Sequence, residues 1–289
     1  MIFPLQRMTH GDFAAFQRLM GTRIITVDGI AWRQVRPCFF RPLLPFQVYR
    51  SDSVSPPAFA FLGGIQYPVS PEIRANSFLN VLVFENTPAY SMASLHKNPR
   101  RQIKLADKEF VIRPISDVDE FKRQAFPVYL SFYKRTRYQV CADRREPDNF
   151  SRWAEALFKI PDVLILGGYR KGKLGGVSLS FVVDRALVYA TFFCDDESLR
   201  LYLSDLMLHC VRQAAGACAG VEQVLAGMYK GIPGLDNFYL LRGAKLMRQR
   251  AWLELNPLAR LLLRSSRPKQ YARLLGSLDH EQIPPREIV

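Results

Sequence analysis

A phenol and an ammonium group stand side by side near the end of an apolar segment of the chain. Tyr229 and Lys230 closely follow residues 221–226 and precede Gly231. We therefore expect them where a buried strand gives way to a loop. A cation and a phenol at a strand end suit a phosphate or carboxylate group of a ligand. An exposed lysine on an ordinary turn fits the sequence equally well, because most lysines are solvated.

Two further titratable residues, Asp205 and His209, fall on an expected helix over residues 197–213. Asp205 lies off the apolar stripe of that helix, so we expect it to be solvated. A lone histidine such as His209 is more often packed or exposed than catalytic. Aromatic and basic residues also alternate near the end of an earlier expected helix: Tyr129, Tyr133, Arg135, Arg137 and Tyr138. They could grip the end of a nucleic acid or a phosphate of an acyl acceptor, or form a core stripe with a basic exposed face.

The composition indicates a packed and strongly basic protein. Of 289 residues, 48% are hydrophobic, and 40 basic residues against 26 acidic ones give a net charge of +14. This excess favours acidic partners such as RNA, an anionic membrane, an acidic carrier protein or a phosphorylated cofactor. A solvated basic surface that aids solubility is the alternative.

The cysteines and histidines exclude the common metal-site patterns. The five cysteines are odd in number and form no Cys-x-x-Cys pair, and the four histidines are scattered. We therefore expect no metal and a reduced, cytoplasmic protein. The first residues lack the pattern of a signal peptide, and no apolar run is long enough to span a bilayer.

Hydrophobic periodicity divides the chain into a strand-rich first part and a mixed second part. In the first part we expect a helix over 9–20 and strands over 24–27, 58–62 and 78–84. A basic run over 97–104 then leads to a strand over 110–113. In the second part we expect helices over 117–137, with a break or kink at Pro127, over 147–159, 197–213 and 234–241, and strands over 163–169, 174–183, 186–194, 221–226 and 245–253.

A basic helical tail follows Asn256 and Pro257. Its leucines at 258 and 261–263 alternate with Arg260 and Arg264. Such a helix could lie on an anionic membrane. It could also pack its leucines on the sheet, and we slightly favour the packed arrangement.

Four segments of the second part resemble the FemAB-like branch of the GNAT acyltransferase superfamily. They are the basic segment 95–106, the hairpin that starts at 172–177, the acidic helix start at 195–198 and the segment 234–244, which is similar to the motif L-Y-x-x-x-G-F. The resemblance covers about half the chain. The first part of the chain matches only in its strand-rich pattern of short apolar segments. It implies an α/β fold with a GNAT-like mixed β-sheet flanked by helices, in two GNAT-like lobes of which the first is degenerate.

The resemblance also bears on the acyl donor. A typical GNAT protein has a glycine loop between the central strand and the long helix, and its backbone N–H groups bind the pyrophosphate of coenzyme A. Here that place holds Asp195, Asp196 and Glu197, which would repel a pyrophosphate. If acyl-coenzyme A is the donor, Lys230 with Tyr229 or the pair Arg100 and Arg101 must hold its phosphates. FemAB relatives that use aminoacyl-tRNA also lack the loop, so aminoacyl-tRNA and an acyl carrier protein are alternative donors.

Tyr239 is the candidate catalytic residue. It is similar in position to the GNAT tyrosine that protonates the leaving group, although most FemAB relatives have lysine there, and it could instead be a core aromatic residue. The resemblance implies transfer of an acyl or aminoacyl group from a thioester or ester to an amine on a small molecule or peptide. The alternative is a noncatalytic GNAT-like module that binds an acidic ligand or an anionic membrane surface.

The expected domains follow from these assignments. We expect a degenerate lobe over residues 1–108, an acyltransferase lobe over 109–256 and the basic tail over 257–289. The protein is expected to be cytoplasmic, and the tail raises the alternative of a peripheral position at the inner face of the membrane. The sequence leaves the oligomeric state open.

Overall fold

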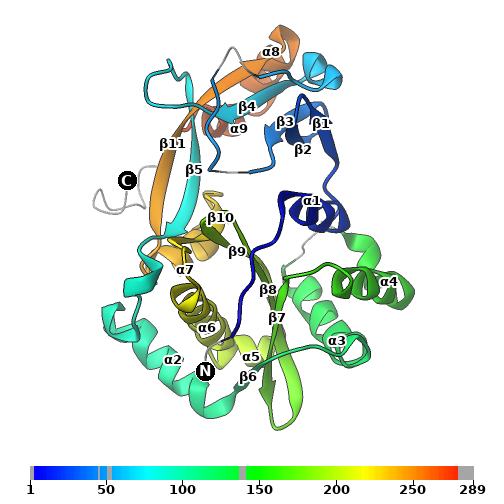
Figure 1. The fold of residues 1–289 in the computed structure, drawn as a ribbon, viewed down its shortest axis with the longest axis vertical. Coiled ribbons are helices and arrows are strands. Elements are labelled where there is room, and N and C mark those ends of the chain that lie inside the picture. Colours follow the sequence, from blue (N-terminus) through cyan, green and yellow to red (C-terminus); the bar gives the residue numbers. More distant parts are fainter. Residues whose placement is uncertain (1–2, 45, 51–53, 137–140, 279–289) are drawn as a thin grey trace. The chain divides into compact units, whose positions relative to one another are not determined.

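A computed structural model describes residues 3–44, 46–50, 54–136 and 141–278. The chain divides into two compact units, each assembled from separate segments (Figure 1). Unit 1 contains Met1–Leu19, Val83–Gly227 and Asn237–Ala244, and unit 2 contains Met20–Leu82, Met228–Asp236 and Lys245–Val289. The expected domain ranges 1–108, 109–256 and 257–289 stay a prediction.

Unit 1 is built on a mixed sheet with the strand order β10-β9-β8-β7-β6. Neighbouring strands are antiparallel from β6 to β9, whereas β9 and β10 are parallel. The elements are α1 (His10–Leu19), η3 (Thr87–Ala89), η4 (Met92–Ser94), α2 (Lys97–Glu109), β6 (Val111–Pro114), α3 (Val118–Thr136), η5 (Ala142–Arg145), α4 (Pro147–Phe158), β7 (Leu164–Arg170), β8 (Lys173–Val183), β9 (Ala186–Cys194), α5 (Asp196–Arg200), α6 (Leu203–Ala217), β10 (Gln223–Met228, whose last residue belongs to unit 2) and α7 (Pro233–Leu240, whose first four residues belong to unit 2).

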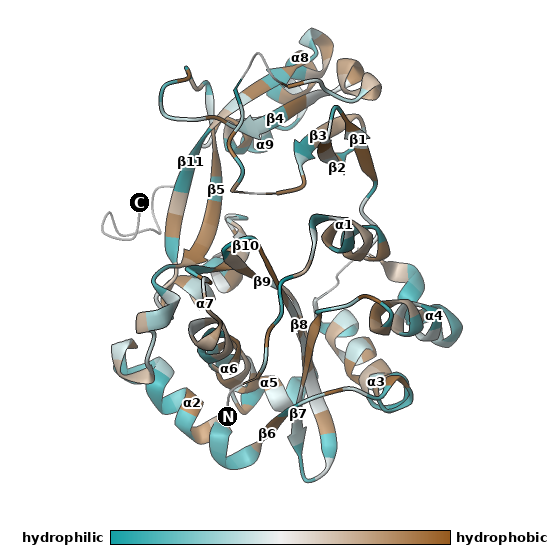
Figure 2. Cartoon of the chain, in the orientation of Figure 1, coloured by the Kyte–Doolittle hydropathy of each residue, from teal (hydrophilic) through white to brown (hydrophobic). Residues whose placement is uncertain are grey.

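Helices cover both faces of this sheet, which explains why β8 is buried along nearly its whole length. On one face the rings of Phe13 and Phe16 from α1 contact Phe181 of β8. On the other face α2 and α6 share a core cluster with residues of the sheet. Figure 2 shows the corresponding polarity, with hydrophilic residues along the outer side of α2. Side chains of β8 and β9 therefore point alternately into two different cores.

The structure divides one expected helix of unit 1 and defines two others in more detail. The expected helix over 197–213 is two helices, because Tyr202 adopts a left-handed conformation (φ 64°) between α5 and α6. Asp195 caps α5, and its carboxylate accepts a hydrogen bond from the Ser198 N–H. The assigned helix α3 continues through Pro127, so the chain does not break there.

The strands of unit 2 follow the order β1-β2-β3-β4-β11-β5 and include both parallel and antiparallel neighbours. Its core contains Trp32, Phe40 and Tyr67, which are almost completely buried. The elements are β1 (Ile24–Val27), β2 (Ile30–Arg36), β3 (Phe39–Pro42), η2 (Ala58–Leu62), β4 (Gly64–Pro68), β5 (Ser77–Phe84, whose last two residues belong to unit 1), β11 (Lys245–Leu255), α8 (Pro257–Ser266) and α9 (Pro268–Leu274).

Residues 58–62 were expected to form a strand and form a 3₁₀ helix instead. Two prolines precede this segment and remove two backbone donors that a strand ladder requires. The tail packs some of its leucines, as the packed arrangement requires, and leaves others exposed, and its binding to a membrane stays a prediction. Leu263 and Leu274 pack against a small core cluster of unit 2, whereas Leu258 and Leu261 are 71% and 65% exposed. No helix in the described part of the chain is long and apolar enough to cross a membrane.

Candidate active site

The parallel strands β9 and β10 are paired over only part of their length. Their paired portion runs only from Ala186 to Val188 on β9, against Gln223 to Leu225 on β10. Beyond Val188, this edge of β9 has no paired strand among the described residues. The register between β8 and β9 also skips Ala190, which is therefore the extra residue of a β-bulge. A bulge beside an unpaired strand edge can aim backbone N–H groups at a ligand.

Polar side chains surround the bulge on the face that α6 covers. Tyr189 lies opposite Ser180 across the strands, and Phe192 lies opposite Ser178. The Tyr189 and Phe192 rings stack with their centroids 6.5 Å apart. The hydroxyl oxygens of Ser178 and Ser180 are buried, and neither has a hydrogen-bond partner within the described structure. Buried hydroxyls without a partner are uncommon, which marks this face of the sheet for a ligand or a water molecule.

Tyr189 is held in its protonated form. Burial raises the pKa of its phenol well above the ordinary value, and the electrostatic effects of Tyr239, Cys194 and Cys210 act in the same direction. Tyr189 and Tyr239 are therefore within electrostatic range of each other. A phenol that stays protonated can donate a hydrogen bond or a proton to a reacting oxygen.

Tyr239 occupies the last turn of α7 and is partly buried. Its ring contacts Phe84, with the centroids 6.4 Å apart, and the neighbouring Phe238, at 5.2 Å. The Tyr239 carbonyl accepts hydrogen bonds from the backbone N–H groups of Arg242 and Ala244, which fixes the end of the helix. The structure thus brings Tyr239 beside the core of unit 1 and near Tyr189, and its catalytic role stays a prediction.

Asp205 is buried rather than solvated, which corrects the expectation from its position off the apolar stripe. Only 3% of the residue is exposed. Its Oδ1 atom accepts a hydrogen bond from Arg242 Nε at 2.8 Å and forms an ion pair with Arg242 Nη2 at 2.6 Å. Burial raises the pKa of Asp205, and Arg242 opposes that shift. Because Arg242 also donates to the carbonyl of Phe238, this ion pair fixes the segment that carries Tyr239.

His209 and Arg212 continue the same buried face of α6. His209 Nδ1 lies 2.8 Å from the Tyr90 hydroxyl, and burial, reinforced by Arg212, lowers the pKa of His209. The Arg212 guanidinium lies 3.7 Å from the centre of the Tyr90 ring and donates to the carbonyl of Arg242. The spacing 205, 209, 212 places all three side chains on one side of a helix. This spacing was the signal in the sequence that could have revealed the polar face.

The acidic side chains at the start of α5 interact with other groups of the protein. The Asp195 side chain occupies the helix end, Asp196 pairs with Arg135 of α3, and Glu197 pairs with Arg170 of β7. The glycine loop that is absent from the sequence is also absent from this part of the structure. An incoming pyrophosphate would meet carboxylates instead of free N–H groups.

The predicted ligand-binding residues lie in different parts of the chain. Arg100 and Arg101 are exposed on α2 in unit 1. Tyr229 is half-buried and Lys230 is exposed, and both belong to unit 2. Buried Asp236 accepts hydrogen bonds from the backbone N–H groups of Lys230 and Ile232. The role of these four residues stays a prediction.

In the aromatic and basic cluster, Arg137 and Tyr138 lie outside the described residues, whereas Tyr129, Tyr133 and Arg135 lie on α3. Tyr129 and Tyr133 are buried, as the core-stripe alternative required. The described part of the chain contains no group of three or more His, Cys, Asp or Glu residues placed to hold a metal ion.

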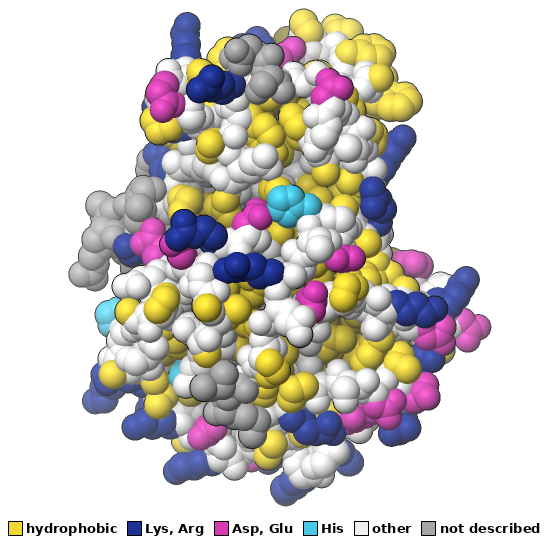
Figure 3. All heavy atoms as spheres, viewed as in Figure 1, with side chains coloured by type: hydrophobic (Ala, Val, Ile, Leu, Met, Phe, Trp, Pro, Cys, Tyr) yellow, Lys and Arg dark blue, Asp and Glu magenta, His cyan; other side chains and the backbone are white. Residues whose placement is uncertain are grey.

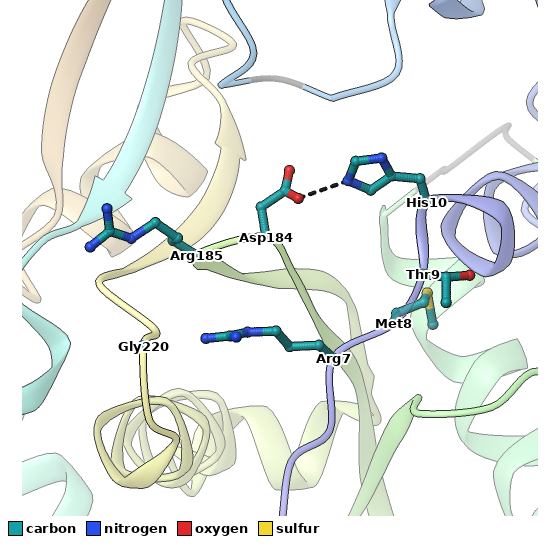
Figure 4. Close-up of a pocket in the computed structure, with 7 residues that line it drawn as sticks. All are labelled: Arg7, Met8, Thr9, His10, Asp184, Arg185 and Gly220. Atoms are coloured by element: carbon teal, nitrogen blue, oxygen red, sulfur yellow. Dashed lines mark hydrogen bonds and ion pairs between the residues drawn. The ribbon is translucent and has the colours of Figure 1, made fainter. Parts of the chain in front are cut away.

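A shallow pocket also opens on the surface of unit 1 (Figure 4). His10 and Asp184 face each other across it, with Nε2 2.7 Å from Oδ1, and both are more than half exposed. Arg7 donates to the carbonyl of Ala219 at its edge. On the molecular face in Figure 3, basic side chains are spread among acidic and apolar ones. The net charge therefore does not by itself locate a site.

Comparisons with known proteins identify the fold. No protein-family model matches the sequence, and a search of curated proteins also finds no match. Among solved structures, the chain is similar to the C-terminal domain of a candidate lysylphosphatidylglycerol synthetase from Agrobacterium fabrum. That similarity has a TM-score of 0.59 and 12% identity, and it covers 93% of this chain and 94% of that chain.

Two further solved structures are similar over most of their length. FemX matches with a TM-score of 0.57 and 10% identity, over 88% of this chain and 92% of that chain. L-PGS from Bacillus licheniformis matches with a TM-score of 0.55 and 11% identity, over 93% of this chain and 97% of that chain. At these identities the similarity establishes the fold alone. The chain therefore has a GNAT-like fold that it shares with FemX and with these synthetase structures, as its sequence predicted.

Proposed function

We propose that the protein transfers an aminoacyl group from a tRNA ester to an amine acceptor. The observation that carries this proposal is the unpaired edge of β9 beyond Val188 with its bulge at Ala190. Backbone N–H groups at such an edge suit the developing oxyanion of acyl transfer. Tyr189 and Tyr239 place phenols near the same strand.

The reaction would proceed by attack of the neutral amine on the ester carbonyl. A C–N bond forms, the carbonyl oxygen becomes an oxyanion beside β9, and the C–O bond of the ester then breaks. The departing ribose oxygen takes a proton from the Tyr239 hydroxyl, and the new amide nitrogen loses its extra proton to water. The tyrosine recovers its proton from water. Positioning and a single acid suffice for this chemistry.

The choice of an aminoacyl-tRNA donor rests on charge. The carboxylates at the start of α5 disfavour the pyrophosphate of coenzyme A in its usual place. The net charge of +14 favours a polyanionic donor. Similarity to FemX and L-PGS supports the same choice as an analogy of fold. Acyl-coenzyme A and an acyl carrier protein are the competing donors.

The test is a transfer assay with the full chain. tRNA charged with radiolabelled amino acids, acetyl-coenzyme A and an acylated carrier protein would each be mixed with a panel of amines and of amine-bearing peptides and lipids. We expect label to move from tRNA to an acceptor and not from the other two donors. Transfer only from coenzyme A would contradict the proposal.

A noncatalytic module is the second candidate, and the missing glycine loop favours it because a degenerate site can lose its donor loop. The two candidates differ in one result. A binding module would bind charged and uncharged tRNA, or an anionic surface, without loss of the ester over that of a buffer control. Enzyme-dependent loss of the ester with formation of an amide would exclude it.

A further inference from the structure

The exposed side of α2 carries a row of positive charges. Five basic residues of this helix are exposed: Lys97, Arg100, Arg101, Lys104 and Lys108. Because an α-helix has about 3.6 residues per turn, these positions fall on one side of it. The buried residues Pro99, Ile103 and Ala106 lie on the opposite side, and Figure 2 shows the hydrophilic outer surface that results. The helix is therefore amphipathic, with its cations turned away from the core.

The five cations of α2 have no acidic partner within the described part of the chain. Arginines elsewhere in unit 1 are paired with carboxylates: Arg113 with Glu120, Arg135 with Asp196 and Arg185 with Glu222. Of the two acidic residues of α2, Glu109 pairs with Arg170 of β7. The other, Asp107, lies within electrostatic range of His209 of α6. The row therefore attracts negative charge from outside the chain.

The start of α2 adds to this charge. The helix begins at Lys97 with no acidic residue in its first turn, and no side chain among the described residues caps it. The first N–H groups of a helix lack partners within it and form the positive end of its dipole. From position 97 to position 108 the row is about 16 Å long, at a rise of about 1.5 Å per residue. A row of that length spans several phosphates of a nucleic-acid strand.

The side chains between the cations distinguish the kind of partner. Among the residues of α2, all of which the structure describes, Leu105 is the one exposed large hydrophobic residue, at 40%. Membrane-binding helices combine cations with an apolar face, and the centre of a protein interface is apolar. A phosphate backbone is held by cations and polar groups alone. The composition of this surface therefore favours a nucleic acid over a membrane or a protein.

The helix α2 also contacts the segment that carries Tyr239. The Gln102 side-chain oxygen accepts a hydrogen bond from Nη2 of Arg242 at 3.3 Å. The same arginine pairs with Asp205 and donates to the Phe238 carbonyl. An RNA strand held along α2 would therefore run beside the element that positions the candidate acid.

We propose that the exposed face of α2 docks the phosphate backbone of the donor RNA. The inference rests on the proposed transfer from aminoacyl-tRNA and adds to it the surface that holds the body of the tRNA. Contacts to phosphates fix the position of a nucleic acid without reading its sequence. The helix α2 should therefore accept tRNAs of different sequence.

Fluorescence anisotropy with deacylated tRNA tests this surface separately from catalysis. In the α2 variant, three lysines of the row are replaced: Lys97→Gln, Lys104→Gln and Lys108→Gln. We expect the α2 variant to bind tRNA about ten-fold more weakly or worse than the wild type. The slope of log affinity against log salt concentration should also become shallower by about two to three, because each lost phosphate contact releases roughly one counterion fewer.

A control variant removes the same number of charges from α3 and from the residue after α4: Arg123→Gln, Lys134→Gln and Lys159→Gln. These side chains are also exposed. The control variant should keep the wild-type affinity and salt slope. Equal weakening in both variants would mean that only the net charge attracts tRNA, and the assignment to α2 would be wrong.

A third variant separates the effect of charge from an effect on folding. It carries Lys97→Arg, Lys104→Arg and Lys108→Arg, keeps every charge of the row and should bind tRNA like the wild type. Both variants of α2 should melt at the wild-type temperature, because exposed substitutions have small effects on stability. Loss of tRNA binding in the arginine variant would show that charge is not the cause and would overturn the proposal.

Transfer and vesicle assays distinguish failure of this inference from failure of the proposed function. If the wild type transfers label from aminoacyl-tRNA while the α2 variant binds tRNA normally, the function stands and the assignment to α2 is wrong. If tRNA binding depends on α2 but no donor supplies label, the RNA-binding surface stands and the proposed transfer is wrong. An α2 variant that keeps its affinity for tRNA and loses binding to phosphatidylglycerol vesicles would assign α2 to a membrane and overturn the proposal.

Discussion

The carboxylate of Asp205 on α6 binds Arg242, which lies two residues beyond the end of α7, through a hydrogen bond of 2.8 Å from Nε and an ion pair of 2.6 Å with Nη2. The side chains are 3% and 12% exposed, respectively. The partners are separated by 37 positions in the sequence. Through this pair, the long helix of unit 1 holds the segment that carries Tyr239, so stability and the position of the candidate acid depend on the same contact.

Breaking this pair should destabilise the protein strongly. Asp205→Asn leaves the Arg242 guanidinium buried without a counter-charge, and we expect a loss of about 3–5 kcal/mol in the free energy of unfolding. Urea denaturation measures it. The double variant Asp205→Asn/Arg242→Gln should lose less than the sum of the single variants. As a control, Asp184→Asn removes the exposed partner of His10 and should cost less than about 1 kcal/mol.

Replacing Tyr239 by phenylalanine should separate activity from stability. The variant keeps the ring contacts with Phe84 and Phe238, so the free energy of unfolding should fall by only about 1 kcal/mol or less. The transfer rate should fall by roughly 10²–10⁴-fold, the contribution of a positioned acid. Tyr271→Phe on α9 is the matched control. Wild-type turnover by the Tyr239 variant would leave Tyr239 as a core aromatic residue.

Stability should fall when the pH decreases below the ordinary pKa of histidine. Burial and Arg212 lower the pKa of His209, whereas Asp107 acts in the opposite direction. In the unfolded chain the pKa of His209 would be about 6.5. Below that pH the unfolded state binds more protons than the folded state, so the free energy of unfolding decreases as the pH falls.

Urea denaturation between pH 8 and pH 5.5 would show this dependence. His209→Gln should reduce the slope, because the titrating group is removed. His96→Gln, at an exposed position, provides the control and should keep the wild-type slope. An unchanged slope in His209→Gln would show that other groups control the acid sensitivity.

The tail should bind anionic vesicles in a salt-dependent manner. Leu258, Leu261 and Leu262 of α8 are 71%, 65% and 64% exposed. Arg260 and Arg264 lie on the same helix. The adjoining 3₁₀ helix η2 adds Phe59 and Phe61, which are 52% and 69% exposed, and Asn256 donates a hydrogen bond to the Phe61 carbonyl. Apolar and basic groups on one surface are typical of membrane-binding helices.

Sedimentation with vesicles of phosphatidylglycerol and phosphatidylcholine tests this expectation. Arg260→Gln/Arg264→Gln should weaken binding to the anionic vesicles, and salt should weaken it further. The control variant Arg18→Gln/Arg74→Gln has the same net charge as Arg260→Gln/Arg264→Gln, and it should bind the anionic vesicles like the wild type. Equal binding to neutral vesicles, or binding to neither kind, would contradict the electrostatic explanation.

The sequence predicted the elements whose periodicity is local and long. The helices α1, α3 and α4 and the strands β7 to β9 lie within a few residues of their expected ranges, because each buries a regular apolar face. It missed β2 and β3, which contain arginines at half-buried positions that interrupt the apolar pattern. It also merged α5 and α6, because the apolar stripe continues across the left-handed Tyr202.

The candidate site was harder to predict than the fold. Tyr239 could be selected because a motif surrounds it, but the pairing of Asp205 with Arg242 depends on a contact between distant segments. Local polarity suggested solvation for Asp205, and nothing within one helical turn indicates its partner. The bulge at Ala190 has no special residue type, because a register shift is a property of two strands rather than of one.

The division of unit 1 into three segments has a consequence for how the chain folds during synthesis. Its last segment, Asn237–Ala244, contains Arg242, so the buried partner of Asp205 leaves the ribosome only after more than four-fifths of the 289 residues have been made. Unit 2 likewise lacks β11 until residue 255. Neither unit can complete its core as an early nascent chain, because domains fold as units once their segments are present. Nascent chains arrested before residue 237 should therefore expose α6, with Asp205 lacking its arginine partner, and depend on chaperones, whereas chains that include α8 and α9 should fold both units.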